Sequence, residues 1–168
     1  MLDFSFKWNR AVRRIMGEAK RVVRERLRDR NDVSVIDLLL ESGVPPIPAA
    51  MNVAEGLARA LGVAAGRLRP GDRLADLCRV SRQELGAVTD EVWSQSKFGE
   101  FAEVGSYDLM FLVETASASD GRTERWRTLE PAPKNEEEWL DRIMEMRVGE
   151  FLRFCTLAGT EAPWRDAV

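Results

Sequence analysis

Residues 5–30 constrain the fold most, because their apolar residues recur at three- and four-residue steps. This spacing puts the apolar side chains on one face of a single long helix and leaves the arginines on its other faces. The apolar stripe consists of Trp8, Val12, Ile15, Ala19, Val22 and Val23. Asn31-Asp32 then ends the pattern.

The same helix is strongly basic, whereas the rest of the chain is acidic. Residues 1–30 hold ten lysines and arginines against four acids, a net charge of +6, while the whole chain carries −3. Such asymmetry is typical of a contact with nucleic acid, a membrane or a partner. It also fits a basic helix that folds back on an acidic body, and both uses stay open. The candidate partner-binding residues are Arg10, Arg13, Arg14, Arg21, Arg24 and Arg28.

Residues 33–97 are predicted to form a helical body of short elements. The expected helices cover residues 33–42, 51–62, 72–77 and 82–97, with the proline-rich segment 44–48 between the first two. Gly62 is a predicted helix stop. Asp72 is the expected N-cap of the third helix, and Ser81 with Glu84 forms a capping-box pattern before the fourth.

Residues 107–129 are predicted to form a β-hairpin. Periodicity alone does not separate a buried strand from a short buried helix over residues 107–116. Asp120-Gly121 is a tight-turn pattern, and the residues after it are rich in threonine and tryptophan. Both features favour the hairpin over the helix.

A last helix is expected over residues 135–158, because Asn135 is a good N-cap and Glu138 completes a capping box. The elements together predict a single α+β domain over residues 1–168, mainly α, with five to six helices and one hairpin. A chain of this length buries roughly two-thirds of its unfolded surface, so it needs no disulfide or metal to fold.

The chain contains no histidine, and this absence excludes many catalytic classes. Ser-His-Asp and Cys-His hydrolysis, HExxH metalloproteases and histidine-ligated metals all require that side chain. Phosphate-binding loop patterns, EF-hand spacing and CxxC pairs are also missing. We therefore expect a protein that is not an enzyme and holds no cofactor or metal. No apolar run approaches the roughly 18 residues that span a bilayer, so a cytoplasmic location is expected.

Residues 53–77 resemble the first helix and the following loop of acyl-carrier-protein-like domains. The resemblance rests on Leu-Gly-Val at residues 61–63, followed by LRPGDRLADL over residues 68–77. In that family the segment leads into an Asp-Ser-Leu motif, whose serine carries a phosphopantetheine arm at a helix N-terminus. This chain lacks the motif, so the resemblance implies a degenerate carrier. Ser81, just after the segment, and Ser106, in a later Gly-Ser-Tyr-Asp sequence, are the candidate attachment residues.

Trp126 lies between Arg125 and Arg127, and tryptophan and arginine are enriched at interface hot spots. With the basic helix, this triplet predicts a non-catalytic protein–protein interaction module with an accessory or regulatory role. Two alternatives stay open: a degenerate acyl-carrier-like protein, and a nucleic-acid-binding protein that uses residues 5–30.

Overall fold

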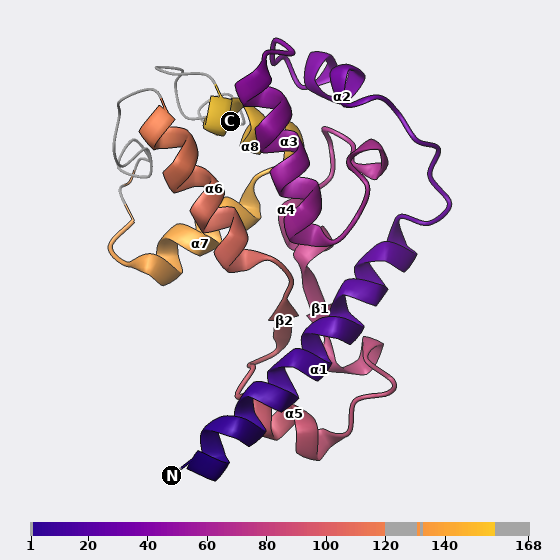
Figure 1. Ribbon diagram of the computed structural model, residues 1–168, viewed down its shortest axis with the longest axis vertical. Helices are drawn as coiled ribbons and strands as arrows, with labels where there is room; N and C mark the ends of the chain where they lie inside the picture. Colours follow the sequence, from indigo (N-terminus) through magenta and orange to yellow (C-terminus); the bar gives the residue numbers. More distant parts are fainter. Residues whose placement is uncertain (1, 120–130, 132, 157–168) are drawn as a thin grey trace.

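Residues 2–119, 131 and 133–156 are described by the structure, a computed structural model (Figure 1). In chain order they form α1 (Leu2–Arg26), α2 (Val35–Glu41), α3 (Pro48–Leu61), η1 (Ala65–Arg67), α4 (Leu74–Cys78), β1 (Arg79–Ser81), η2 (Arg82–Glu84), α5 (Asp90–Ser96), β2 (Phe101–Glu103), α6 (Ser106–Ser119), α7 (Glu136–Glu145) and α8 (Val148–Thr156). This part of the chain is mainly helical with one two-stranded antiparallel sheet. The predicted α+β, mainly α class is confirmed, with more helices than the expected five or six.

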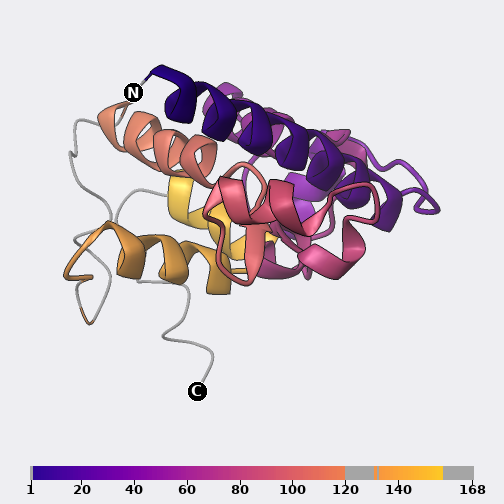
Figure 2. The same cartoon turned by 90° about the horizontal axis from the view of Figure 1, so that it is seen from below.

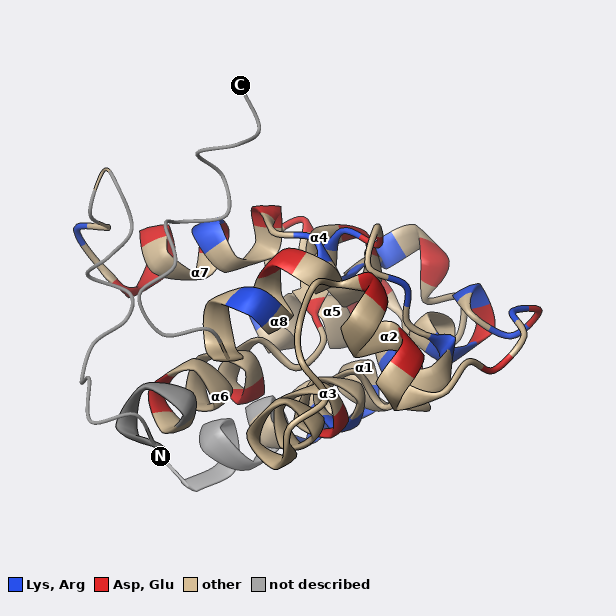
Figure 3. Cartoon of the chain, turned by 90° about the horizontal axis from the view of Figure 1, so that it is seen from above, with Lys and Arg blue, Asp and Glu red and all other residues tan. Residues whose placement is uncertain are grey.

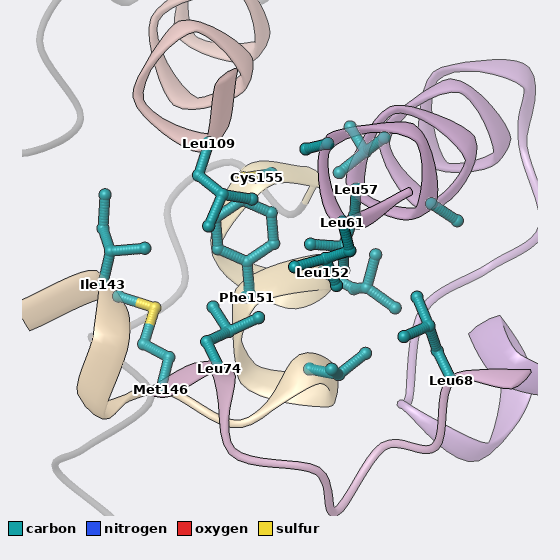
Figure 4. Packing of buried hydrophobic residues seen from close by; sticks show 14 of the residues in the cluster. Leu57, Leu61, Leu68, Leu74, Leu109, Ile143, Met146, Phe151, Leu152 and Cys155 are labelled. Carbon is teal, nitrogen blue, oxygen red and sulfur yellow. The ribbon is translucent and has the colours of Figure 1, made fainter. Parts of the chain in front are cut away.

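The larger hydrophobic cluster, called here the main cluster, is built by α3, α6 and α8, which pack against one another. Leu57 and Leu61 of α3 face Phe151 and Leu152 of α8, and Leu109 of α6 closes the group (Figure 4). All five side chains are fully buried. The helices α2, α4 and α7 cover the outside of this core.

A second hydrophobic cluster lies under α1, whose buried face is formed by Ile15, Ala19 and Val23, each 0 % exposed. Its other members come from the segment between residues 79 and 104, among them Val80 of β1 and Ala102 of β2. In Figures 1 and 2, α1 runs alongside α5 and the two strands. The amphipathic N-terminal helix predicted from the sequence therefore covers a core of its own.

The segment 79–104 leaves the main body and returns to its starting point. β1 and β2 pair antiparallel, with Val80 opposite Ala102. At the base of this pair the Val104 N–H donates to the Cys78 carbonyl at 2.8 Å. The chain therefore re-enters the main cluster directly beside the end of α4, and α6 begins there.

The predicted hairpin over residues 107–129 is wrong for its first half, because Ser106–Ser119 is the helix α6. Leu109 and Val113 face α3 and α8 and are buried, whereas Tyr107 and Phe111 face outward. This helix is apolar on two sides, so its sequence shows no helical periodicity. The second half of the predicted hairpin lies outside the described residues.

Two predicted long helices are divided. The expected helix 82–97 is the short turn η2 followed by α5, which starts after Thr89, whose Oγ1 accepts from the Val92 N–H at 3.3 Å. The expected helix 135–158 breaks at Met146, whose extended backbone separates α7 from α8. The break lets the Met146 carbonyl accept from the Leu74 N–H at 2.9 Å, and this bond ties the bend to the start of α4.

Candidate functional site

The six arginines predicted to bind a partner share one face of α1 and of the turn that follows it. Arg10, Arg13, Arg14, Arg21, Arg24 and Arg28, called here the arginine face, are all exposed. They lie opposite the buried stripe of Ile15, Ala19 and Val23, since both sets repeat at three- to four-residue steps but are offset by half a helical turn. The arginine face therefore points away from the second cluster.

Two further arginines tie this helix and its following turn to the body. Arg26 donates to the carbonyls of Asp76 and Arg79 at 2.8 and 2.9 Å, and to the Glu84 carboxylate at 2.7 Å. Arg30 forms a two-pronged ion pair with Asp72, at 2.6 and 2.9 Å. The basic helix thus folds back on the acidic body, which was one of the two uses left open.

The contact with Arg26 also lowers the pKa of Glu84. Burial raises the pKa of this carboxyl, but hydrogen bonds from Arg26 and Ser81 lower it by more, so the pKa lies below its ordinary value. The Glu84 contribution to stability is therefore complete above the ordinary carboxyl pKa of about 4. It is lost as the pH falls through the lower pKa of the folded state.

Asp72 does not cap α4 as predicted. The N-cap of α4 is Arg73, which makes no side-chain cap bond. The Asp72 carboxylate instead accepts from the Arg69 N–H at 2.8 Å, in addition to its pair with Arg30. The Asp72 carboxylate therefore forms a long-range ion pair and not the predicted cap, because the end of the basic segment places Arg30 beside it.

Half of the arginine face is engaged within the chain. Arg21 pairs with Glu18 at 3.2 Å, and Arg28 with Glu25 at 3.5 Å. Arg14 donates to the Ala87 carbonyl at 3.3 Å. Arg10, Arg13 and Arg24 have no hydrogen bond or ion pair to any residue that the structure describes. These three guanidinium groups are available to an external anion.

The remaining predicted partner-binding residues, Arg125, Trp126 and Arg127, lie outside the described residues. The structure therefore does not relate this triplet to the arginine face.

The two candidate attachment serines lie in different settings. Ser81 ends β1 opposite Phe101, and both its N–H and its hydroxyl donate to the Glu84 carboxylate, at 2.8 and 3.1 Å. The predicted capping box of Ser81 and Glu84 is confirmed, although it caps the three-residue turn η2. Ser106 is the first residue of α6 and is half-buried. Its hydroxyl forms no hydrogen bond within the described part of the chain.

Gly105 sets the position of Ser106. Its φ is +74°, in the left-handed region that glycine adopts without strain. A Cβ atom at this position would lie 2.5 Å from the Ala60 carbonyl oxygen, so the chain passes directly against the end of α3. The left-handed turn and the close approach together fix where α6 begins.

An open cavity of about 660 Å³ lies beside Ser106, between α1, β2, α6 and α7. Its apolar lining includes Val12 and Met16 of α1, Met110 of α6 and Leu140 of α7. The charged lining consists of Lys20, Glu103, Asp108, Glu136 and Glu137. The sequence does not predict this cavity, because its walls come from three distant parts of the chain: α1, the stretch from β2 into α6, and α7.

The two cysteines are buried thiols, 0 % exposed at Cys78 and 3 % at Cys155. Burial, and next the neighbouring Glu103, raises the pKa of Cys78 to about 12, so this thiol stays protonated at neutral pH. Among the described residues no group of three or more Cys, Asp or Glu side chains could hold a metal ion. None of the described helices combines the length and the apolar character that crossing a bilayer requires.

Comparison of the chain with family models, with curated protein sequences and with solved structures finds no match. The fold and the candidate site define a mainly helical α+β protein with a basic outer helix face.

Proposed function

We propose that the protein is a non-catalytic interaction module whose arginine face binds an acidic surface of a partner protein. The observation that carries this proposal is the division of α1 into two opposite faces. Ile15, Ala19 and Val23 form a completely buried face that packs on the body. Arg10, Arg13 and Arg24 on the opposite face make no hydrogen bond or ion pair to any described residue, so these three side chains do not hold the helix in place.

The spacing of the three unengaged arginines suits an elongated acidic partner. Between Arg10 and Arg24 the helix rises about 21 Å, which is about four turns. A partner helix with carboxylates at three- to four-residue steps would present its charges at the same repeat. Each guanidinium group can bind a carboxylate with two parallel hydrogen bonds. Complementary charge of this kind speeds association and selects the partner.

The proposal is tested by reversing charge on the arginine face. We expect the triple variant Arg10→Glu, Arg13→Glu and Arg24→Glu to lose the partner that the wild-type protein recovers from native lysate after nuclease treatment. The three side chains are exposed and make no internal ion pair, so the variant keeps its fold. Recovery is measured by quantitative mass spectrometry at two salt concentrations, because an electrostatic contact weakens as salt rises.

The matched control is the triple variant Arg59→Glu, Arg73→Glu and Lys134→Glu, which changes the net charge equally at exposed positions off the arginine face. This control should recover the partner as the wild type does. Equal loss in both variants would reject the proposal, since it would indicate a general charge effect. Recovery that disappears with nuclease treatment would favour nucleic-acid binding through residues 5–30 instead.

A second candidate function is that of a degenerate acyl-carrier-like protein, and the position of Ser106 favours it. The resemblance over residues 53–77 covers most of α3, the following loop and most of α4. Because Val104 returns to Cys78, Ser106 follows that segment in space although the intervening chain separates them in sequence. Ser106 starts a helix and lines an open cavity, which fits a serine that carries a prosthetic arm.

The carrier candidate is tested by intact-mass measurement after co-expression with a phosphopantetheinyl transferase. We expect the wild-type chain and the Ser81→Ala variant to gain the mass of one phosphopantetheine group, and the Ser106→Ala variant to gain none. The Ser81 hydroxyl is hydrogen-bonded to Glu84, whereas the Ser106 hydroxyl makes no hydrogen bond to a described residue, so Ser106 is the expected attachment residue. An unmodified wild-type chain would reject this candidate and leave the interaction module unaffected.

A further inference from the structure

The cavity beside Ser106 continues into an exposed aromatic surface. Phe101 and Tyr107 line the cavity and are 42 % and 79 % exposed, and Phe111 on the next turn of α6 is 67 % exposed. Tyr107 joins the two regions, because it lines the cavity and lies about one helical turn before Phe111 on α6. Scattered single apolar residues on a surface are ordinary, but a continuous apolar surface that leads out of a cavity marks a binding site.

This apolar surface is bordered by negative charge. Asp108, Glu136 and Glu137 line the cavity and form no ion pair among the residues that the structure describes. Glu103 is already paired with Arg79 at 3.1 Å, and Lys20 is the cation in the lining. Acidic residues are seen on both α6 and α7 in Figure 3. The border therefore favours a ligand that carries positive charge around an apolar face.

We propose that the cavity and the outer face of α6 form a second docking site, which binds a basic amphipathic helix of a partner protein. This site is distinct from the arginine face and selects the opposite charge. A helix in this position would insert its apolar side chains, at steps of three and four residues, among Met16, Met110 and Phe101. Its lysines or arginines would pair with Asp108 and with the carboxylates that begin α7.

The extent of the apolar surface favours a helix over a small molecule. A ligand contained in the cavity would leave Phe111 in water, because this side chain does not line the cavity. Tyr107 and Phe111 are four residues apart, so both lie on one side of α6 and extend the site along the helix axis. An extended partner covers both of them and the cavity together.

The probe is a fluorescein-labelled synthetic helix of leucines at positions i, i+3, i+4 and i+7 with lysines between them. Binding to the full chain is measured by fluorescence anisotropy. A scrambled peptide of the same composition has no apolar face, and an analogue with glutamates in place of lysines has the wrong charge. We expect the designed helix to bind at least about tenfold more tightly than either control, since both an apolar anchor and a complementary rim are needed. Equal binding of the scrambled peptide would overturn the proposal, because it would reflect the net acidity of the body alone.

The site is located by two variants of exposed residues. Phe111→Ser and the pair Asp108→Lys with Glu137→Lys should each weaken binding of the designed helix about fivefold or more. The control is Leu40→Ser on α2, where a side chain 57 % exposed is replaced outside the site, and it should bind as the wild type does. Unchanged binding in both site variants, or an equal loss in the control, would overturn the proposal. The triple variant Arg10→Glu, Arg13→Glu and Arg24→Glu should bind this peptide as the wild type does. The proposal for the cavity site can therefore be rejected without rejecting the proposal for the arginine face.

Discussion

Replacement of Gly105 by alanine should lower the free energy of unfolding by about 2–5 kcal/mol. A non-glycine residue in the left-handed region costs roughly 1–2 kcal/mol, and Gly105 has a φ of +74°. The added methyl group would also lie 2.5 Å from the Ala60 carbonyl oxygen, a backbone atom of α3 close to Ala60 and Leu61, which are packed in the main cluster. Forcing extra volume into a packed site costs about 1–3 kcal/mol more. Urea denaturation followed by tryptophan fluorescence measures the difference.

Gly86→Ala is the matched control for this experiment. A Cβ atom at Gly86 meets nothing within 4 Å, and its φ is not positive. We therefore expect the control to change stability by less than about 0.5 kcal/mol. Similar stabilities for the two variants would mean that the left-handed turn before α6 is not required, and the placement of Ser106 would lose its physical basis.

Replacement of Ile15 by alanine should destabilise the protein by about 2–4 kcal/mol, because its side chain is 0 % exposed and the space left cannot fill completely. The effect should be uneven along the chain. Ile15 belongs to the second cluster, which holds residues 79–104 against α1. Hydrogen exchange should therefore accelerate most in α1 and in residues 79–104, and least in α3 and α8.

Arg13→Ala is the control on the opposite face of the same helix, where the side chain is exposed and makes no internal ion pair. Its effect on stability should stay within about 0.5 kcal/mol. If Ile15→Ala accelerated exchange equally in α3 and α8, the two clusters would unfold as one unit. Because α1 forms one wall of the second cluster, deletion of residues 1–30 would expose the apolar side chains of residues 79–104 and is a poor test of partner binding.

Features set by neighbouring residues were predictable from the sequence. Asn135 caps α7 as expected, with its Oδ1 accepting from the Glu138 N–H at 2.9 Å. Gly62 ends α3 in the left-handed conformation, with a φ of +69°. The arginine face follows from residue spacing alone, because a helix converts that spacing directly into a common direction.

Features set by distant residues were not predictable. The break at Met146 depends on hydrogen bonds to the chain around Leu74, which no local pattern encodes. The residues of α6 do not distinguish a helix from a strand, because its outward face carries Tyr107 and Phe111 and so polar residues do not mark its solvent side. The Asp120-Gly121 turn pattern then favours a hairpin. The cavity could not be predicted from the sequence either, because its walls meet only when α1, α6 and α7 are packed together.

The packing of α1 against residues 79–104 also determines when, during synthesis, this helix can bury its apolar face. At roughly 5–20 residues per second, the ribosome needs about 4–15 s after α1 to complete the segment that covers it. Until residue 80 is synthesised, Ile15, Ala19 and Val23 have none of their buried partners from the 79–104 segment of the second cluster. A nascent basic helix with an open apolar face is the kind of segment that chaperones recognise and that aggregates when they are absent. The many arginines of this helix then oppose aggregation, because like charges on neighbouring nascent chains repel one another until the second cluster is complete.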